Sequence, residues 1–426
     1  MFALSEVIGI VPGAGRASRI GGFFKELTPI NVSELDSSHF VVVSERIIEL
    51  ISSTGAAPIY FVLNTEKQLI SEYFGRANLF PGKRILYANQ DNTDQYYGMP
   101  FAIDAVYYEA RGKTVLLGMP DTLIEPDNSF KILLQRFRTH NADLELGLFK
   151  AKRGNFGGFV EFDRDTLKVL NHIDKTSPEF PSDRADNAWA IACWNGRFTE
   201  FMHNFIENKR NNYKNSGNLR EKELLFGDII DAAISSKEFN ICADFISKDE
   251  GYYLDITEPK KYFEAVLHYH ESVVDNRYFD GSRNVTKLET KIFISHSSIQ
   301  KKHAEKLHKL LKSAGFYPIL DAYDISPGQN ILNRVEQLIN ESSYFILLLT
   351  KESLSSNWVS VEIALAYAKG MVKQERLCPV QIGEIDENEA NSQPFIPKNT
   401  YNWLDGTSDL TTVVTWIEMR FERANS

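Results

Sequence analysis

The apolar run Tyr344–Thr350 (YFILLLT) and the following segment Ser355–Tyr367 (SSNWVSVEIALAY) decide how the second half of this 426-residue sequence is interpreted. An almost uniformly apolar heptapeptide is typical of a strand that is buried on both faces of a parallel sheet. Glu362 comes one helical turn after Trp358, so the two side chains share a helix face just beyond that strand. Open α/β sheets bind ligands at this edge, although a solvated glutamate on the outer helix face fits the same spacing.

Other motifs surround this segment in a fixed order. Lys291–Ser298 (KIFISHSS) has the pattern of a first strand and its loop, and Asp321 with Asp324–Gly328 (DISPG) has that of a second. Together with Ser353–Glu362, this ordered set resembles a TIR domain over residues 288–426. Strand and helix patterns alternate through the same region, which predicts a parallel sheet with helices on both faces.

The resemblance implies a flavodoxin-like fold and, as in the NAD-cleaving members of the family, NAD⁺ as substrate with Glu362 as the catalytic carboxylate. It also implies an NAD pocket lined by Ser295, His296, Asp324 and Trp358. Trp358 is better suited to packing than to stacking on the ligand, and His296 could equally be a loop histidine without a role. Enzymatic TIR domains commonly build this pocket from neighbouring copies, so a homo-oligomer formed through the TIR domains is expected.

The N-terminal half opens with a glycine loop. A predicted strand, Glu6–Pro12, runs directly into Gly13-Ala14-Gly15, and the cations Arg19 and Lys25 follow. Glycines after a strand let backbone N–H groups approach a phosphate, whose charge the two cations can neutralise. Two glycines alone are equally consistent with a tight turn. Residues 11–30 as a whole resemble the signature of sugar-1-phosphate nucleotidyltransferases, although Phe24 stands where that family has a proline.

Two carboxylates extend this resemblance. Thr114–Asp121 (TVLLGMPD) places an acid directly after a buried strand, where Mg²⁺ could bind through oxygen ligands, unless Asp121 merely caps a helix. Gly251–Pro259 resembles the family's final motif, which implies that Asp255 is the second metal ligand. The implied nucleotide-binding residues are Gly13, Ala14, Gly15, Arg19, Lys25, Gln90 and Gly98, with Arg19 and Lys25 also catalytic. The implied sugar-binding residues are Gly158, Glu161 and Lys175.

Composition narrows the class of protein. A net charge of −10 argues against general nucleic-acid binding, which needs a basic footprint. The apolar runs are too short to span a membrane, and no signal peptide is apparent, so a cytoplasmic location is expected. Cys193, Cys242 and Cys378 are far apart and form no CxxC pair, which predicts neither a disulfide framework nor a zinc site.

These patterns predict three parts: a nucleotidyltransferase-like domain with a mixed, Rossmann-like (GT-A-like) sheet at residues 1–274, a linker at 275–289 and a TIR domain at 290–426. The polar stretch 208–223 is predicted to be a mobile loop or an insertion. The two resemblances imply a prokaryotic TIR effector that releases nicotinamide from NAD⁺ in anti-phage defence. Its N-terminal domain would bind or process a nucleotide or nucleotide sugar with Mg²⁺. The alternatives are an active sugar-1-phosphate nucleotidyltransferase whose TIR domain serves only for assembly, and a scaffold with both sites inactive.

Overall fold

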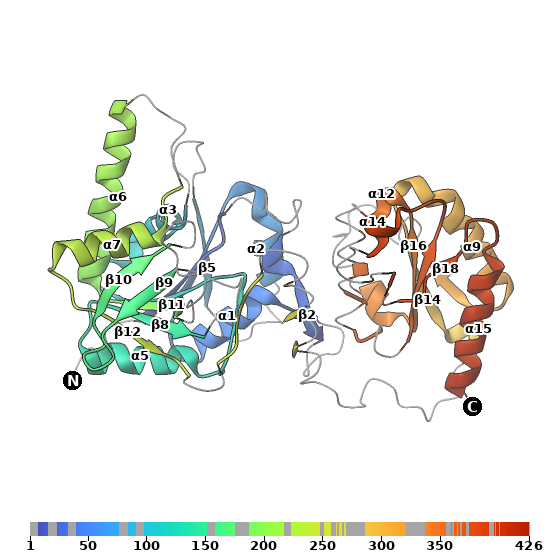
Figure 1. The fold of residues 1–426 in the computed structure, drawn as a ribbon, viewed down its shortest axis with the longest axis horizontal. Helices are drawn as coiled ribbons and strands as arrows, with labels where there is room; N and C mark the ends of the chain where they lie inside the picture. Colours follow the sequence, from blue (N-terminus) through green and yellow to red (C-terminus); the bar gives the residue numbers. More distant parts are fainter. Residues whose placement is uncertain are drawn as a thin grey trace. The chain divides into compact units, whose positions relative to one another are not determined.

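The structure is a computed structural model. It describes residues 7–15, 24–32, 40–75, 84–90, 98–150, 158–174, 187–216, 223–247, 251–256, 286–320, 337–354, 375–391 and 401–425, with single residues and short pieces within 261–269, 359–371 and 396–399. The chain divides into two compact units (Figure 1). The first unit comprises the described residues within 1–18, 24–27 and 43–257, and the second those within 28–42 and 258–426. Most of the predicted linker, 275–285, lies outside the described residues, so the two predicted boundaries, at 274/275 and 289/290, remain predictions.

The first unit contains the predicted mixed sheet, which is built from nine of its described strands (Figure 1). Its parallel part has the order β5 (Ile85–Asn89), β4 (Ile59–Leu63), β1 (Val7–Pro12) and β6 (Thr114–Gly118). Beyond β6 lies β11 (Ala188–Trp194), which pairs with β6 and at which the sheet branches. One branch continues through β9 (Phe159–Phe162) to β10 (Val169–Ile173), and the other through β8 (Leu144–Phe149) to β12 (Ile241–Phe245). The pairs between these strands are antiparallel with one exception. Only β12 pairs in parallel there, with β8.

Helices cover both faces of this sheet. One face carries α1 (Val43–Ser52) and α5 (Ser129–His140), and a Cβ on Gly118 of β6 would lie only 2.7 Å from Ile47 and 3.0 Å from Phe130. The other face carries α3 (Met99–Asp104), α4 (Tyr107–Ala110), α6 (Gly196–Ser216) and α7 (Phe226–Ser236). The sheet is therefore an internal layer, which explains why its central strands are apolar on both faces.

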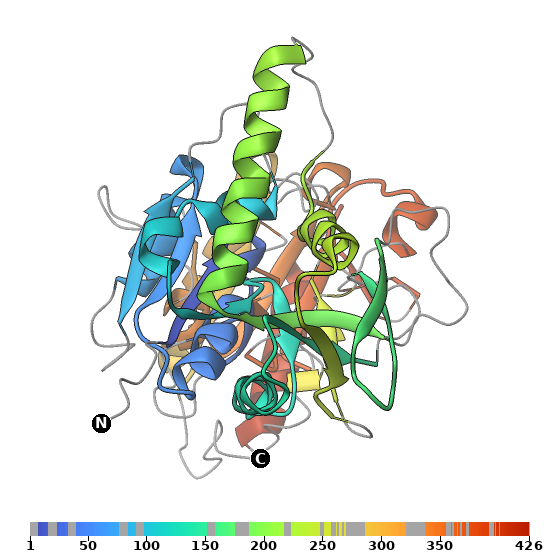
Figure 2. The ribbon, with the colours of Figure 1, turned by 90° about the vertical axis from the view of Figure 1, so that its left-hand side faces the viewer.

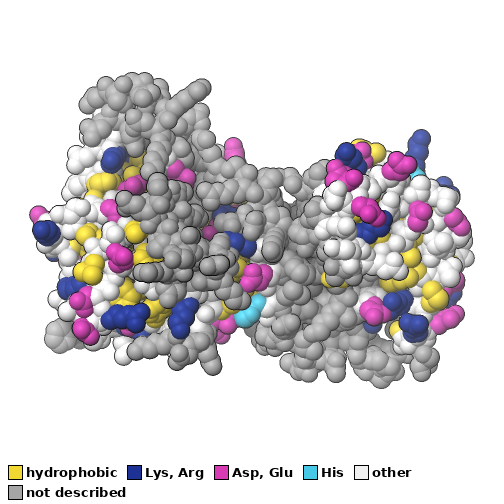
Figure 3. Space-filling model, viewed as in Figure 1, with side chains coloured by type: hydrophobic (Ala, Val, Ile, Leu, Met, Phe, Trp, Pro, Cys, Tyr) yellow, Lys and Arg dark blue, Asp and Glu magenta, His cyan; other side chains and the backbone are white. Residues whose placement is uncertain are grey.

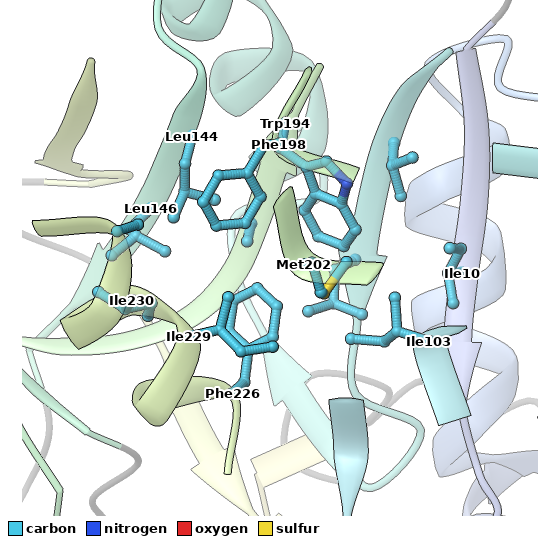
Figure 4. Close-up of a cluster of buried hydrophobic side chains, with 14 of the residues drawn as sticks. Ile10, Ile103, Leu144, Leu146, Trp194, Phe198, Met202, Phe226, Ile229 and Ile230 are labelled. Atoms are coloured by element: carbon cyan, nitrogen blue, oxygen red, sulfur yellow. The ribbon is translucent and has the colours of Figure 1, made fainter. Parts of the chain in front are cut away.

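The main core of the first unit lies under α6 and α7. Figure 4 shows Leu144 and Leu146 of β8 meeting Phe198 of α6 and Phe226 of α7. Because side chains alternate along a strand, Glu145 between the two leucines is directed to the opposite face, toward α5. This alternation places one fully buried carboxylate beneath α5.

Short elements complete the first unit. A two-stranded antiparallel sheet joins β7 (Thr122–Ile124) to β13 (Tyr253–Asp255). The remaining elements are η2 (Lys25–Leu27), η3 (Thr65–Lys67) and α2 (Gln68–Phe74). The two short strands β2 (Pro29–Val32) and β3 (Phe40–Val42), which pair with each other, are grouped with the second unit.

Helix α6 corrects the prediction of a mobile loop at 208–223. The helix continues to Ser216 and extends away from the sheet (Figure 2), while residues 217–222 lie outside the described part. Arg210 stabilises this extension because its Nη1 lies 3.0 Å from Asp104 and its guanidinium stands over the ring of Phe101. The asparagine-rich composition suggested a loop, but no glycine or proline interrupts the helix before Gly217.

The second unit contains the predicted parallel sheet. Its order is β15 (Tyr317–Ile319), β14 (Lys291–Ser295), β16 (Tyr344–Leu349), β17 (Leu377–Gln381) and β18 (Leu404–Asp405). This 2-1-3-4-5 order is that of flavodoxin-like folds. Its helical elements include η5 (Lys287–Glu289), η6 (Ser298–Gln300), α9 (Lys301–Ser313), α12 (Lys351–Leu354), α14 (Glu387–Asn391) and α15 (Thr411–Asn425).

The core of the second unit joins α9 and α15 to one face of the sheet. Leu307 and Leu311 of α9 and Ile417 of α15 are buried with Ile346 and Leu348 of β16. On the described face visible in Figure 3, acidic and basic side chains of this unit are interspersed rather than gathered by sign. Among the described helices, none combines the length and apolar character needed to cross a bilayer.

Candidate functional sites

The first candidate site lies where the strand order of the mixed sheet reverses. In the sheet, β1 lies between β4 on one side and β6 on the other. Such a switch point opens a crevice beyond the carboxyl ends of the strands. β1 ends at Pro12 and leads into the glycine loop. β6 ends three residues before Asp121. The topology thus brings the two predicted motifs to one edge of the sheet.

The two glycines of the loop have different environments. The N–H of Gly13 donates to the carbonyl oxygen of Val62 at 2.7 Å, and a Cβ on Gly13 would lie 2.6 Å from the ring of Phe61. Gly15 is exposed, and a Cβ there would meet nothing within 4 Å. Packing therefore requires glycine at position 13, whereas the backbone at Gly15 is open to a ligand.

Two side chains from the segment after β4 hold the loop in place. Lys67 Nζ donates to the Gly13 carbonyl at 2.7 Å and to Glu26 Oε1 at 2.5 Å, and both charged side chains are only 2% exposed. Asn64 Nδ2 donates to the Ala14 carbonyl at 2.9 Å. With both carbonyls engaged, the peptide groups of the loop have a fixed orientation. Sequence reasoning missed these residues, for which the only local signal is that Asn64 also caps η3.

Lys25, Asp121 and Asp255 come together at the same edge. Lys25 Nζ donates to Asp121 Oδ2, Asp255 lies opposite Thr122 in the β13–β7 pair, and the N–H of Ile256 donates to the Asp121 carbonyl at 2.9 Å. Burial alone would lower the pKa of Lys25. The charge and hydrogen bond of Asp121, followed by the charges of Asp255 and Glu26, instead raise this pKa above its usual 10.5.

This donor set fits the predicted magnesium ion. Two carboxylates, one directly before β7 and one at the end of its partner β13, provide the hard oxygen ligands that Mg²⁺ prefers. The ammonium group of Lys25 already balances part of their charge. The arrangement can therefore bind a cation together with an anionic ligand such as a polyphosphate.

The other predicted residues of this site have varied environments. Gln90 directly follows β5 and is buried, with its N–H donating to the Leu63 carbonyl at 2.8 Å. Gly98 has a φ of 123°, and a Cβ there would clash with the carbonyl oxygen of Leu224, so packing alone requires this glycine.

The predicted sugar-binding residues lie on and beside β9. Gly158 is buried against the ring nitrogens of His172 and Trp189, which a Cβ would strike. Glu161 is exposed on β9, opposite Asn171 of β10. Arg19 and Lys175 lie outside the described residues.

The second candidate site lies at the carboxyl end of the parallel sheet in the second unit. The strand order reverses between β14 and β16, and β14 ends at Ser295. The Ser295 hydroxyl donates to Glu362 Oε2 at 2.5 Å, and each residue is 1% exposed. Glu362 is thus more buried than the expected ligand position at a helix start, because it lies against the end of β14.

The loop after β14 is fixed by Gln300. Its Nε2 donates to the Leu348 carbonyl of β16 at 3.1 Å, and its Oε1 accepts the N–H of Ser297 at 2.8 Å. Gln300 therefore ties the loop that carries His296 to the neighbouring strand, and His296 is buried. Sequence reasoning did not identify Gln300, and Asp324 and Trp358 of the predicted pocket lie outside the described residues.

Comparison with known proteins gives a family match for the second unit and a structural similarity for the first. Residues 292–416 match the family model of the TIR domain, so the second unit contains a TIR domain, as its motifs predicted. The first unit is structurally similar to sugar-1-phosphate nucleotidyltransferases, which is the similarity predicted from its motifs. No curated protein matches the chain.

Three solved structures illustrate the similarity of the first unit. A putative glucose-1-phosphate thymidylyltransferase from Bacillus anthracis has 13% identity and a TM-score of 0.48, covering 64% of this chain and 98% of its own. A UDP-glucose pyrophosphorylase from Acinetobacter baumanii has 14% identity and a TM-score of 0.47, covering 63% and 94%. HddC from Yersinia pseudotuberculosis has 14% identity and a TM-score of 0.43, covering 62% and 99%.

Proposed function

We propose that the TIR domain of this protein cleaves NAD⁺ between nicotinamide and ribose, with Glu362 as the catalytic carboxylate. The observation that carries the proposal is the hydrogen bond from Ser295 to Glu362 at the switch point of the parallel sheet. A carboxylate at this edge stands where flavodoxin-like sheets bind ligands. Its burial favours strong interaction with a developing positive charge.

The chemistry follows from the charge of Glu362. Breaking the bond to nicotinamide builds positive charge on the ribose, which a nearby carboxylate stabilises in the transition state. The Ser295 hydroxyl fixes the orientation of that carboxylate, and Gln300 fixes the loop that follows Ser295. The site is therefore organised before the substrate arrives, which lowers the reorganisation needed during the reaction.

The N-terminal domain is proposed to bind a nucleotide or nucleotide sugar and thereby to control the TIR domain. The loop at Gly15 would receive phosphate oxygens, Lys25 would neutralise them, and Asp121 and Asp255 would hold Mg²⁺. When bound, the ion would supply positive charge for the phosphates. In a prokaryotic cell this arrangement would couple detection of phage infection to NAD⁺ loss.

A second candidate function is favoured by the Lys25–Asp121–Asp255 cluster. These residues are also suited to catalysis of nucleotidyl transfer from a nucleoside triphosphate to a sugar-1-phosphate, with release of pyrophosphate. In that case the TIR domain would serve only for assembly. Both proposed functions require a homo-oligomer that forms through the TIR domains.

One experiment separates the two functions. Full-length protein is incubated with Mg²⁺, NAD⁺ and a panel of nucleoside triphosphates, sugar-1-phosphates and nucleotide sugars, and nicotinamide and pyrophosphate are quantified together. Nicotinamide release that depends on a nucleotide ligand, without pyrophosphate release, is the expected result. Pyrophosphate release without nicotinamide release would establish the second function instead.

Assembly is tested in the same reaction. The NAD⁺ turnover per molecule should rise with protein concentration, and light scattering should show a matching rise in mass. Constant turnover per molecule in a protein that stays monomeric would contradict a shared pocket. Both measurements use the full chain, so that the control by the N-terminal domain is retained.

A further inference from the structure

A fully buried carboxylate lies on the face of the mixed sheet that α5 covers, away from the nucleotide site. Glu145 of β8 is 0% exposed. In the strand register it stands between Cys193 of β11 and Cys242 of β12, so the three residues form a row across three neighbouring strands. Residues in register point to the same face, which sets two thiols beside one carboxylate.

Helix α5 adds a histidine to this row. His140 Nδ1 lies 3.1 and 3.0 Å from the two oxygens of Glu145. One turn earlier on the helix, Arg136 pairs with Asp244 of β12 at 3.2 Å. The donor atoms of His140, Glu145 and Cys242 all lie within 4.8 Å of one another. Four ligand atoms around one zinc ion stand about 3.3–3.8 Å apart, so small side-chain adjustments would complete such a site.

Asn240 organises the surroundings of these donors. Its Nδ2 donates to the carbonyls of His140 and Asn141 at 3.1 and 2.9 Å, which holds the end of α5. Its Oδ1 accepts the Cys242 thiol at 3.3 Å. The same amide thus holds the histidine segment and the thiol side by side, and Lys168 Nζ donates to the same Oδ1. When the thiol loses its proton to a metal ion, its bond to Asn240 is given up, whereas the two bonds that hold the end of α5 remain.

We propose that His140, Glu145 and Cys242 bind a zinc ion that fastens α5 to strands β8 and β12. Nitrogen, oxygen and sulfur donors in one cluster suit the borderline-soft Zn²⁺ better than Mg²⁺ or Ca²⁺. The His140 side chain is 20% exposed, so solvent can reach the cluster and supply a fourth ligand. Sequence spacing predicted no zinc site, because donors that meet only through sheet register leave no CxxC pattern.

A second cluster among the described residues provides the contrast. Asp104, His203 and Glu207 also bring their donor atoms within 4.8 Å of one another. Arg210 forms ion pairs with both acids there, and His203 stacks on Tyr107 with ring centroids 3.7 Å apart. The guanidinium group of Arg210 is bonded directly to both carboxylates, and this fixed cation disfavours a metal ion at the same place.

Zinc binding has a proton balance that can be measured. The Cys242 thiol carries its proton in this structure, because it donates to Asn240 Oδ1. Coordination requires the thiolate, and the thiol proton therefore passes to the buffer when the ion binds. The heat of binding should depend on the ionisation enthalpy of the buffer.

Cobalt substitution in the full-length protein tests the proposal. The protein is stripped with a chelator, dialysed and titrated with Co²⁺ in the presence of Mg²⁺. A thiolate-to-cobalt charge-transfer band with a stoichiometry of one is expected, as is displacement of Co²⁺ by Zn²⁺. Ions at Asp121 and Asp255 give no such band, because that site has no sulfur. Absence of the band from the wild type would overturn the proposal without reference to any variant.

Variants then define the ligands. His140→Ala, Glu145→Gln and Cys242→Ala should each weaken zinc binding by more than the roughly 10–100-fold that loss of an outer-shell partner costs. Cys193→Ala and Cys378→Ala serve as matched controls and should retain the cobalt band, and circular dichroism in chelator verifies folding. Loss of the band in Cys193→Ala alone, or its retention in Cys242→Ala, would overturn the assigned ligand set.

Discussion

The two candidate sites handle charge in different ways, although both lie at switch points of α/β sheets. In the first unit, Asp121 is bonded to the ammonium group of Lys25, and both side chains are partly exposed. In the TIR domain, Glu362 is almost fully buried and is bonded by the neutral hydroxyl of Ser295. The first site holds charges of both signs and suits an anionic ligand with a metal ion. The second holds a buried carboxylate, whose negative charge suits the proposed stabilisation of a positively charged ribose.

The two sites also differ in the interactions that fix the positions of their residues. The glycine loop of the first unit depends on a buried ion pair behind it, between Glu26 and Lys67. The TIR site depends on neutral hydrogen bonds from Ser295 and Gln300. Substitutions behind the first site should therefore reduce stability, whereas substitution of Glu362 should reduce the rate of reaction.

The largest expected effect is on stability and comes from Lys67→Met. Removing the lysine leaves the Glu26 carboxylate buried without its cation, which typically costs about 3–5 kcal/mol. Denaturant unfolding of the full chain, followed by tryptophan fluorescence of the first unit, measures the change. Lys131→Met, at an exposed position of α5, is the matched control and should change the free energy of unfolding by less than about 0.5 kcal/mol.

The double variant Glu26→Gln/Lys67→Met sharpens this test. Since it removes both charges, it should recover part of the stability lost in Lys67→Met. A single Lys67→Met variant that costs less than about 1 kcal/mol would show that the pair does not anchor the loop, and the comparison between the two sites would then fail.

The next effect is on catalysis and comes from Glu362→Gln. The substitution keeps shape and hydrogen-bonding capacity but removes the charge, so nicotinamide release should fall a few hundredfold, or about 3–4 kcal/mol. Nucleotide binding by the N-terminal domain should be unchanged. Glu422→Gln, on the exposed surface of α15, removes the same charge and should retain activity. Near wild-type turnover by Glu362→Gln would move the catalytic role to another residue.

The sequence predicted the strands that carry both sites because burial leaves a local signal. The apolar runs at Thr114–Gly118 and Tyr344–Leu349 need no knowledge of the rest of the fold. Asp121 and Glu362 follow these runs in the sequence, and in an α/β sheet the segments that follow the strands lie at their carboxyl ends. Glycine 15 and the neighbouring loop were also evident, because a GxG after a strand is a local pattern.

Contacts between distant segments could not be predicted in the same way. The bond from Lys67 to Gly13 joins residues 54 positions apart, and nothing in the sequence around Lys67 distinguishes it from a surface lysine. Cys242 meets Glu145 only because β12 pairs with β8 in one particular register. Helix α6 was misread for a related reason, since packing and ion pairs extended a helix that composition alone disfavoured.

A smaller effect is expected on binding and comes from Asp121→Asn. One ligand charge for Mg²⁺ is lost, and affinity for a nucleoside triphosphate or nucleotide sugar should fall about 10–100-fold, or about 1.4–2.7 kcal/mol. Calorimetry with and without Mg²⁺ measures this, and Asp165→Asn in an exposed turn is the charge-matched control. If the wild type binds none of these ligands in the presence of Mg²⁺, the first site is not a nucleotide site.

The smallest effect is on the titration of Lys25. Burial lowers the pKa of this lysine while Asp121 raises it, so Asp121→Asn should move the pKa from above 10.5 toward or below it, and Asp165→Asn should leave it unchanged. Because the folded-state pKa exceeds the unfolded value, Lys25 stabilises the wild-type fold fully below pH 10.5, and this contribution is lost as pH rises through the folded-state pKa. NMR titration of the lysine side chain, alongside unfolding at several alkaline pH values, measures both quantities. An unchanged Lys25 pKa in Asp121→Asn would mean that the ion pair does not control this site, and the electrostatic contrast with Glu362 would lose its basis.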